Sequence, residues 1–441
     1  MQRYSRRDVL KLGVATAISS TLGGYPVLAG AANLPGQHFV PEKGARLRVL
    51  RWKQFVQGDL DTFAANTRRF TELTGVEVKL ETDSWEDVRP KAVLAANVGG
   101  GPDIIFGTND DPHRFADKLV DLTELAEDLG KRYGGWYDTP RTYATSNGRW
   151  ISLPQGGAPS CMVYRVSHLK AAGFDRFPED LPGFLRLCRQ LKKSGTPAGF
   201  ALGHATADAN SFVHWCLWAH GGKVVDVNGN VVLDSPESIA AINYMMEIQK
   251  TLPWDTMSWL DPSNNKAFHA GEISLTNNGV SIYAVAKISA DPKLQAIAKD
   301  IGHASFPVGP VGRPTEFSVM FFACLFKYSK YPNAAKEYLR FLWEREQVDP
   351  WMIASNGYVS PALVAFEKSP VWTADPLITP YRDALKRVLT NGHAGKLGAA
   401  SAAVMGDFIV VDMFADACSG TRSPKEAARR AAERAKRHYG T

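Results

Sequence analysis

The sequence predicts an α/β protein built from two lobes. Residues 46–51 and 76–81 alternate polar and apolar side chains as strands do, and residues 104–106 form a short apolar run. Helical spacing of apolar residues fills both intervals, over 61–73 and 87–98. This strand–helix–strand–helix–strand order is typical of a parallel sheet flanked by helices. Because 441 residues exceed what one hydrophobic core usually covers, a second lobe is expected.

The rest of the chain is predicted to contain longer helices separated by short strands. Residues 317–326 are apolar on both faces, which favours a strand covered on both sides. The last helix carries the basic run 427–436, interpreted as a solvated face. The other expected helices are 181–193, 212–220, 237–251, 334–344 and 402–417, and the other expected strands are 162–164, 199–202 and 273–276.

The N-terminus has the pattern of an export signal. Basic residues precede an uncharged stretch, 12–32, that ends in small residues, so residues 1–31 are predicted to be a signal peptide. Residues 5–11 (SRRDVLK) resemble the twin-arginine export box, with Val9 in place of the usual Phe. A retained membrane anchor is the alternative, although serines and glycines interrupt the apolar stretch. The inferred location is the periplasm.

Charge and cysteine content argue against nucleic-acid binding and a disulfide framework. The net charge is +6, and removal of residues 1–31, which hold four basic residues and one acidic residue, leaves +3. That value is too small to indicate a nucleic-acid partner. The five cysteines are widely spaced and form no C-x-x-C motif, so buried free thiols are expected, with one disulfide left open.

Several short motifs resemble, in collinear order, those of the extracellular solute-binding proteins that include the maltose-binding protein. The resemblance runs from about residue 45 to the C-terminus. The matching segments are 74–78 (TGVEV), 101–104 (GPDI), 153–154 (LP), 164–165 (YR), 221–222 (GG), 234–237 (DSPE), 267–272 (AFHAGE), 278–279 (NG), 335–339 (AKEYL), 419–420 (SG) and 423–428 (SPKEAA).

The resemblance implies two α/β lobes joined by crossing segments, with a ligand held in the cleft between them. The three expected hinges contain glycine or proline, which suits positions where the backbone must bend. The expected division is an N-lobe of 45–152 plus 316–355, a C-lobe of 158–312 plus 362–441, and hinges near 152–159, 313–318 and 356–361.

Candidate ligand-binding residues in the N-lobe follow the predicted strands. A polyol needs directional hydrogen bonds to replace water, and its C–H faces pack on aromatic rings. Trp52, Trp85, Thr108 and Asp110 lie after the strands, where ligands of α/β sheets bind. Plain core packing is the alternative for the two tryptophans, and capping of the next helix is the alternative for Asp110.

The C-lobe candidates come from segments that match the family's ligand-facing parts. They are Asn210, Trp215, Asn277, Asn278 and Tyr283. Trp215 has the strongest case among the tryptophans.

Two further candidates are Glu316 and Asp407, and the second of them bears on the size of the ligand. Glu316 lies in the second hinge, where a lobe-bridging ion pair is the alternative role. Gly107, Ser281 and Asp407 stand where the maltose-binding protein stacks aromatic rings. With fewer aromatic rings to stack on a linear sugar chain, and with a carboxylate at one of these positions, the chain is expected to bind a monosaccharide, disaccharide or polyol and not a long maltodextrin.

The predicted function is that of a monomeric solute-binding protein that delivers a small carbohydrate to the permease of an ABC importer, without a cofactor or a metal. Two S-x-x-K matches, at 167–170 and 263–266, lack the partner motifs of serine acyl-transferases, and no H-E-x-x-H motif occurs, so an enzyme is not expected. A periplasmic hydrolase of similar carbohydrates and a sensor with the same clamp remain alternatives.

Overall fold

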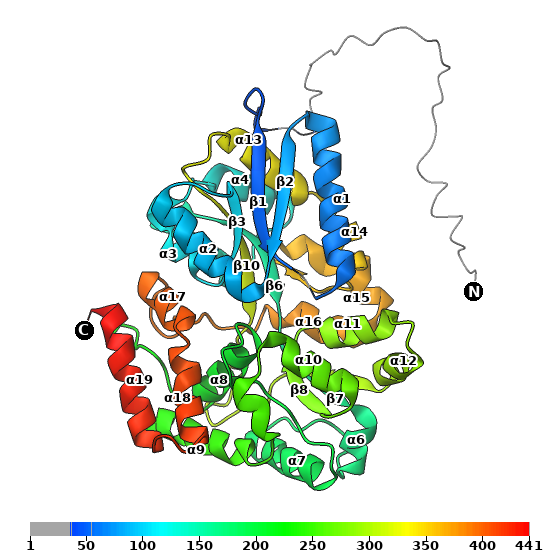
Figure 1. Cartoon of the computed structure of the whole chain (residues 1–441), viewed down its shortest axis with the longest axis vertical. Helices are drawn as coiled ribbons and strands as arrows, with labels where there is room; N and C mark the ends of the chain where they lie inside the picture. Colours follow the sequence, from blue (N-terminus) through cyan, green and yellow to red (C-terminus); the bar gives the residue numbers. More distant parts are fainter. Residues whose placement is uncertain (1–35, 37, 54, 441) are drawn as a thin grey trace.

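A six-stranded mixed sheet forms the centre of the N-lobe, the upper lobe in Figure 1. The structure is a computed structural model that describes residues 36, 38–53 and 55–440. β1 (Arg46–Trp52) pairs in parallel with β2 (Glu77–Asp83) and with β3 (Ile104–Thr108). Helices α1 (Gln57–Thr74) and α2 (Trp85–Val98) connect these strands, as the alternation predicted.

Chain segments from far along the sequence complete this sheet. β10 (Val319–Leu325) is buried at every residue and lies antiparallel between β3 and β6 (Leu153–Ala158). This confirms the prediction of a strand covered on both faces. β11 (Ser360–Pro361) closes the order β11-β6-β10-β3-β1-β2.

The C-lobe, below it in Figure 1, has a smaller sheet in the order β8-β7-β9. β7 (Cys161–Arg165) pairs antiparallel with β8 (Leu275–Asn278) and β9 (Ile301–Ala304). The strand expected at 199–202 is absent among the described residues, where only an isolated bridge joins Ala198 to Leu275. Helices α7 (Leu181–Lys193), α8 (Asp208–Ala219), α9 (Pro236–Gln249) and α10 (Asp261–Ala270) belong to this lobe.

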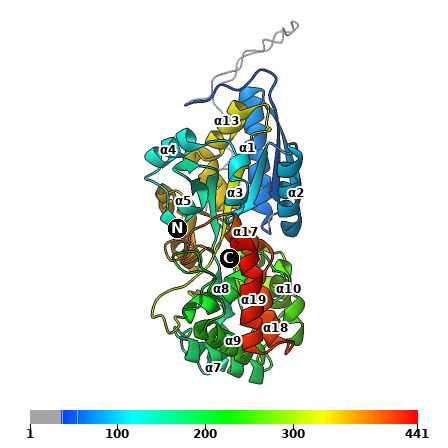
Figure 2. The same cartoon turned by 90° about the vertical axis from the view of Figure 1, so that its left-hand side faces the viewer.

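The single helix expected at 402–417 is two helices. α17 (Ala399–Gly406) ends before Asp407, and α18 (Ile409–Cys418) begins after Phe408, whose φ of 53° is left-handed and breaks the helical path. α17 packs on α3 (Asp111–Arg114) of the N-lobe and on α19 (Pro424–Tyr439) of the C-lobe (Figure 2). This short helix therefore lies across the junction of the two lobes.

Shorter elements cover the remaining faces. The described part contains no helix long and apolar enough to span a membrane, and its five cysteines are unpaired. The predicted signal peptide lies outside the described residues. The other elements are α4 (Thr123–Arg132), α5 (Asp138–Ala144), β4 (Thr145–Ser146), β5 (Arg149–Trp150), α6 (Val166–Ala171), α11 (Ser281–Ile288), α12 (Pro292–Lys299), α13 (Pro332–Leu342), α14 (Arg345–Ala354), α15 (Pro370–Ala374) and α16 (Thr379–Ala384), with 3-10 turns at Ala116–Lys118, Trp254–Ser258, Val364–Lys368 and Pro376–Ile378.

Candidate functional site

A cleft of about 550 Å3 lies between the two lobes. Its upper wall comes from the end of β1, from α2 and from the β3–α3 turn, and its lower wall comes from residues 204–206, the start of α10 and the α17–α18 junction. This position matches the rule that ligands of open α/β sheets bind beyond the carboxyl ends of the parallel strands.

The upper wall is aromatic where β1 ends. Trp52 is almost fully buried and its ring lies 5.2 Å from that of Trp85, in an edge-to-face arrangement. Phe321 of β10 packs against Trp52, with ring centroids 4.1 Å apart. The indole N–H groups of both tryptophans are buried without a hydrogen-bond partner among the described residues, a cost that a bound acceptor would relieve.

The lower wall carries a stacked pair that the sequence analysis did not identify. The rings of His204 and Phe408 lie 4.5 Å apart and within 6° of parallel. Nε2 of His204 lies 2.8 Å from Oδ1 of Asp412, which orients the imidazole. Phe408 reaches the cleft because its left-handed backbone turns the chain between α17 and α18. Aromatic faces therefore line both walls.

Polar groups at the β3–α3 turn add charge to the upper wall. Oδ2 of Asp111 accepts hydrogen bonds from the backbone N–H of Thr108 at 2.9 Å and from its hydroxyl at 3.2 Å. Nε of Arg89 lies 2.8 Å from Oδ1 of Asp111. Arg114, at the end of α3, also lines this part of the cleft.

A narrower polar recess of about 30 Å3 extends the cleft towards α8 and α10, and Trp85 lines both spaces. Asp261 accepts hydrogen bonds from the backbone N–H groups of residues 206–208 at the start of α8. Asp208 accepts one from Nδ2 of Asn264 at 2.9 Å. Burial, and then the neighbouring charge of Asp261, raise the pKa of Asp208. A carboxyl group that keeps its proton can donate to a ligand hydroxyl as well as accept from one.

Four of the sequence-predicted residues line these spaces. Trp52, Trp85 and Thr108 line the main cleft, and Asn278 lines the recess. Their contribution to binding stays a prediction.

Trp215 lies in the core of the C-lobe and lines neither space, which corrects the expectation that it faces ligand. Its ring is packed among Phe184, Phe212 and Phe306, and its indole N–H donates to the carbonyl of Pro307 at 2.9 Å. The physical reason is that α8 is buried along its whole length and that Trp215 lies beyond the first turn, the only part of this helix that borders the recess.

Asn210, Asn277 and Tyr283 are also buried and occupied by protein partners. Nδ2 of Asn210 donates to the carbonyl of Thr206 at 3.0 Å, and Nδ2 of Asn277 donates to the carbonyl of Asp208 at 3.0 Å. The hydroxyl of Tyr283 donates to Asp375 at 2.7 Å. These three side chains hold the C-lobe together and do not line the cleft or its recess.

The three predicted carboxylates are likewise placed outside the cleft lining. Asp110 is buried and accepts a hydrogen bond from Nδ2 of Asn391 at 2.9 Å. Glu316 lies 3.4 Å from Arg387, the ion-pair role expected as its alternative. Asp407 is half exposed and pairs with His438 at 2.9 Å. Each carboxylate already has a structural partner.

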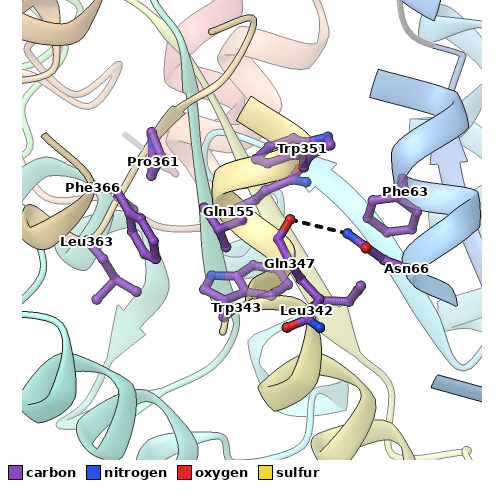
Figure 3. Close-up of a pocket in the computed structure, with 12 residues that line it drawn as sticks. Phe63, Asn66, Gln155, Leu342, Trp343, Gln347, Trp351, Pro361, Leu363 and Phe366 are labelled. Atoms are coloured by element: carbon purple, nitrogen blue, oxygen red, sulfur yellow. Dashed lines mark hydrogen bonds between the residues drawn. The ribbon is translucent and has the colours of Figure 1, made fainter. Parts of the chain in front are cut away.

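A second cavity lies inside the N-lobe between α1, α14 and the β6 strand (Figure 3). It holds only about 30 Å3 and is lined mainly by apolar side chains such as Phe63, Trp343 and Phe366. Some of its few polar groups already form hydrogen bonds within the protein, since Nδ2 of Asn66 donates to the carbonyl of Gln347 at 3.3 Å. A polar solute would lose its hydrogen bonds with water there, so the interlobe cleft is the better candidate.

The described residues contain no group of three histidine, cysteine, aspartate or glutamate side chains placed to hold a metal ion.

Comparison with known proteins identifies one family. The family described as "Bacterial extracellular solute-binding protein" matches residues 66–380. A Deinococcus radiodurans protein named "Probable ABC transporter-binding protein" is 23% identical over 209 residues, which cover 45% of this chain and 48% of that protein. The chain thus aligns with about half the length of this relative.

Solved structures show the same architecture. The maltose-bound MalE3 of T. maritima has a TM-score of 0.76 at 21% identity, over 89% of this chain and 99% of that one. An ABC transporter solute-binding protein from Thermotoga lettingae TMO, bound with α-D-tagatose, has a TM-score of 0.76 at 17% identity, over 90% of this chain and 100% of that one. At these identities the likeness establishes the two-lobed fold.

Proposed function

This chain belongs to the bacterial extracellular solute-binding protein family, and from that premise we propose that it binds a mono- or disaccharide or a polyol and delivers it to the permease of an ABC importer. Membership of an extracellular family implies an exported protein.

The observation that carries the proposal is the composition of the cleft. Aromatic rings from both lobes, Trp85 above and Phe408 with His204 below, face a space of about 550 Å3. Such rings pack on the C–H faces of a sugar, while hydroxyl, amide and carboxyl groups at its edges replace the hydrogen bonds of water. Thr108 and Asn278 supply such groups from opposite lobes. Similar folds hold maltose and α-D-tagatose, which supports a sugar.

Ligand binding would couple to lobe closure. Groups from the two lobes can be satisfied together only when the cleft is shut, so the ligand favours the closed state. The expected hinges, near 152–159, 313–318 and 356–361, include Gly156 and Gly357, whose φ values of 148° and 68° are backbone conformations that glycine tolerates. The closed monomer would then present the solute to the permease.

The export route follows from the sequence of residues 5–11. Twin-arginine signals carry folded proteins to the periplasm. Replacement of Arg6 and Arg7 by lysine should keep the precursor in the cytoplasm, as measured by fractionation of cells that express the full chain.

The experiment that tests the function is thermal unfolding with maltose, D-tagatose, D-glucose and sorbitol, followed by calorimetry. A ligand that binds only the folded state at about a hundredfold excess over Kd stabilises it by about 2.7 kcal/mol. The sugar should be recovered unchanged after incubation, as read by NMR. A chemically altered sugar would support a hydrolase instead, and the absence of any binding would reject a carbohydrate carrier.

A further inference from the structure

We infer that the solute carries an acidic group, a carboxylate or a phosphate, which binds to the guanidinium groups of Arg89 and Arg114 in the upper wall of the cleft. This inference rests on the proposed function and specifies its ligand as an acidic sugar.

The main cleft carries an excess of positive charge in its upper wall. Among the described side chains that line it, the charged groups are Arg89, Arg114 and Asp111, together with His204, which is paired with Asp412. Asp111 is nearly buried and faces Arg89, so it balances one of the two guanidinium groups. One positive charge in the upper wall is left without a carboxylate partner among the described residues.

The positive charge without a carboxylate partner lies on Arg114, close to Arg89. Arg114 forms no ion pair and no side-chain hydrogen bond with the described part of the chain, although it is partly buried. Its Nη1 atom lies 3.6 Å from the point that a β-carbon would occupy at Gly406, and Nη1 of Arg89 lies 2.7 Å from the same point. The two guanidinium groups therefore converge from α2 and α3 on the end of α17. Figure 2 shows α17 beside α3, at the level where the two lobes meet.

Two guanidinium groups that lie close together suit an anionic ligand. A guanidinium group donates several hydrogen bonds in one plane, which suits the oxygens of a carboxylate or a phosphate. Two partly buried guanidinium groups that lie close together repel each other, and an anion bound between them relieves that repulsion. Asp111 and Thr108 hold Arg89 in place with contacts of 2.8 Å and 3.4 Å, so the group is oriented before a ligand arrives.

The recess beyond Trp85 suits the hydroxyl groups of a sugar. It contains the carboxyl groups of Asp208 and Asp261 and the amide group of Asn278, which can form hydrogen bonds with hydroxyls, and the negative charge of Asp261 would repel a second anionic group. An acidic sugar can place its anion at the arginine pair and its hydroxyls towards the recess. The two ends of the cleft thus select opposite ends of one molecule.

The test is calorimetric titration of the full exported chain with D-glucuronate, D-galacturonate and D-glucose 6-phosphate, each beside its neutral parent, D-glucose or D-galactose. At least one acid should bind about tenfold or more tightly than its parent, since hydrogen bonds to charged groups contribute more than neutral ones. The uronates and the phosphate distinguish the two sources of negative charge. Higher NaCl concentration should weaken the acid more than the parent.

Arg114→Gln should abolish the preference for the acid over its neutral parent, and Arg114→Lys should restore part of that preference. Arg186→Gln, at an exposed arginine of α7, is the matched control and should change neither affinity. If the wild type binds neutral parents as tightly as acids, the acidic-ligand inference is wrong and the sugar-binding function stands. If neither acids nor parents bind, the inference and the proposed function both fail.

Discussion

Trp85 in the cleft and Trp215 in α8 both touch other aromatic rings, but they differ in what completes their surroundings. Trp215 is fully buried and its indole N–H is bonded to the carbonyl of Pro307. Trp85 is partly buried, lines both the cleft and its recess, and its N–H has no partner among the described residues. An aromatic side chain is available to a ligand only where the protein leaves one of its faces and its polar edge unused.

The same contrast separates two consecutive carboxylates. Asp110 points into the interior and is held by Asn391, whereas Asp111 lines the cleft and orients Arg89. Each pair of residues offers a comparison in which one member should affect stability and the other should affect binding.

The largest effect is expected from Trp215→Ala. The change removes a ring packed among phenylalanines, so the free energy of unfolding should fall by about 3–5 kcal/mol. Urea unfolding followed by circular dichroism measures this loss. Any variant that remains folded should keep its sugar affinity. A loss of sugar affinity without a loss of stability would show that Trp215 contacts the ligand after all.

A pH-dependent effect is expected at Asp110. Burial raises its pKa from 3.8 to about 6, while hydrogen bonds from Ser401 and Asn391 oppose the rise. The folded state then holds a proton that the unfolded state has released, so stability is greatest below pH 4 and falls as pH rises from about 4 to about 6. A difference of about two pKa units corresponds to about 3 kcal/mol.

Asp110→Asn should remove this dependence because the amide does not titrate, and its oxygen can still accept from Asn391. The difference in unfolding free energy between variant and wild type should therefore grow in favour of the variant between pH 4 and pH 6. Urea titrations at four pH values test it, with the exposed Asp234→Asn as the control. A constant difference would mean that Asp110 is already ionised at pH 4.

The sequence predicted the parts of this molecule that depend on local pattern. Alternation located β1 and β2, and the rule for strand ends placed Thr108 beside the cleft. The break at Phe408 was missed because residues 402–417 keep helical spacing, and only the left-handed backbone reveals the turn. Trp215 was assigned wrongly because sequence spacing does not show that this part of α8 packs among the phenylalanines of the C-lobe core.

Arg89 and Arg114 were not recognised for a related reason. In the sequence Arg89 is one charged residue of the helix expected at 87–98, and Arg114 lies outside every expected element, so no pattern links the two residues to a binding site. Their position in the cleft depends on α17, which arrives from near the other end of the chain and packs on α3. No local pattern carries that contact.

Trp85→Ala should have the opposite profile to Trp215→Ala. Its removal should weaken sugar binding by about 1–3 kcal/mol, because apolar area that packs on the sugar is lost. The free energy of unfolding should change by less, since the ring is only partly buried. Calorimetry measures the change in sugar affinity, and urea unfolding of the same preparation measures the change in the free energy of unfolding. Equal losses in both would show that Trp85 supports Trp52 and does not contact the ligand.

The smallest effect is expected from Gly406→Ala, which probes the space between the lobes. A β-carbon there would lie 2.7 Å from Nη1 of Arg89, the far end of a flexible side chain, so the guanidinium group would shift while the backbone stays in place. Gly406 is the last residue of α17, where alanine costs little or adds slightly to stability, within about 1 kcal/mol. The displaced guanidinium should weaken acidic sugars several-fold and leave neutral sugars unchanged, as measured by calorimetry. Gly398→Ala, at the start of the same helix with no atom within 4 Å of its β-carbon position, is the matched control. Equal weakening of neutral and acidic sugars would mean that the added methyl group hinders lobe closure, and that Arg89 does not select charge.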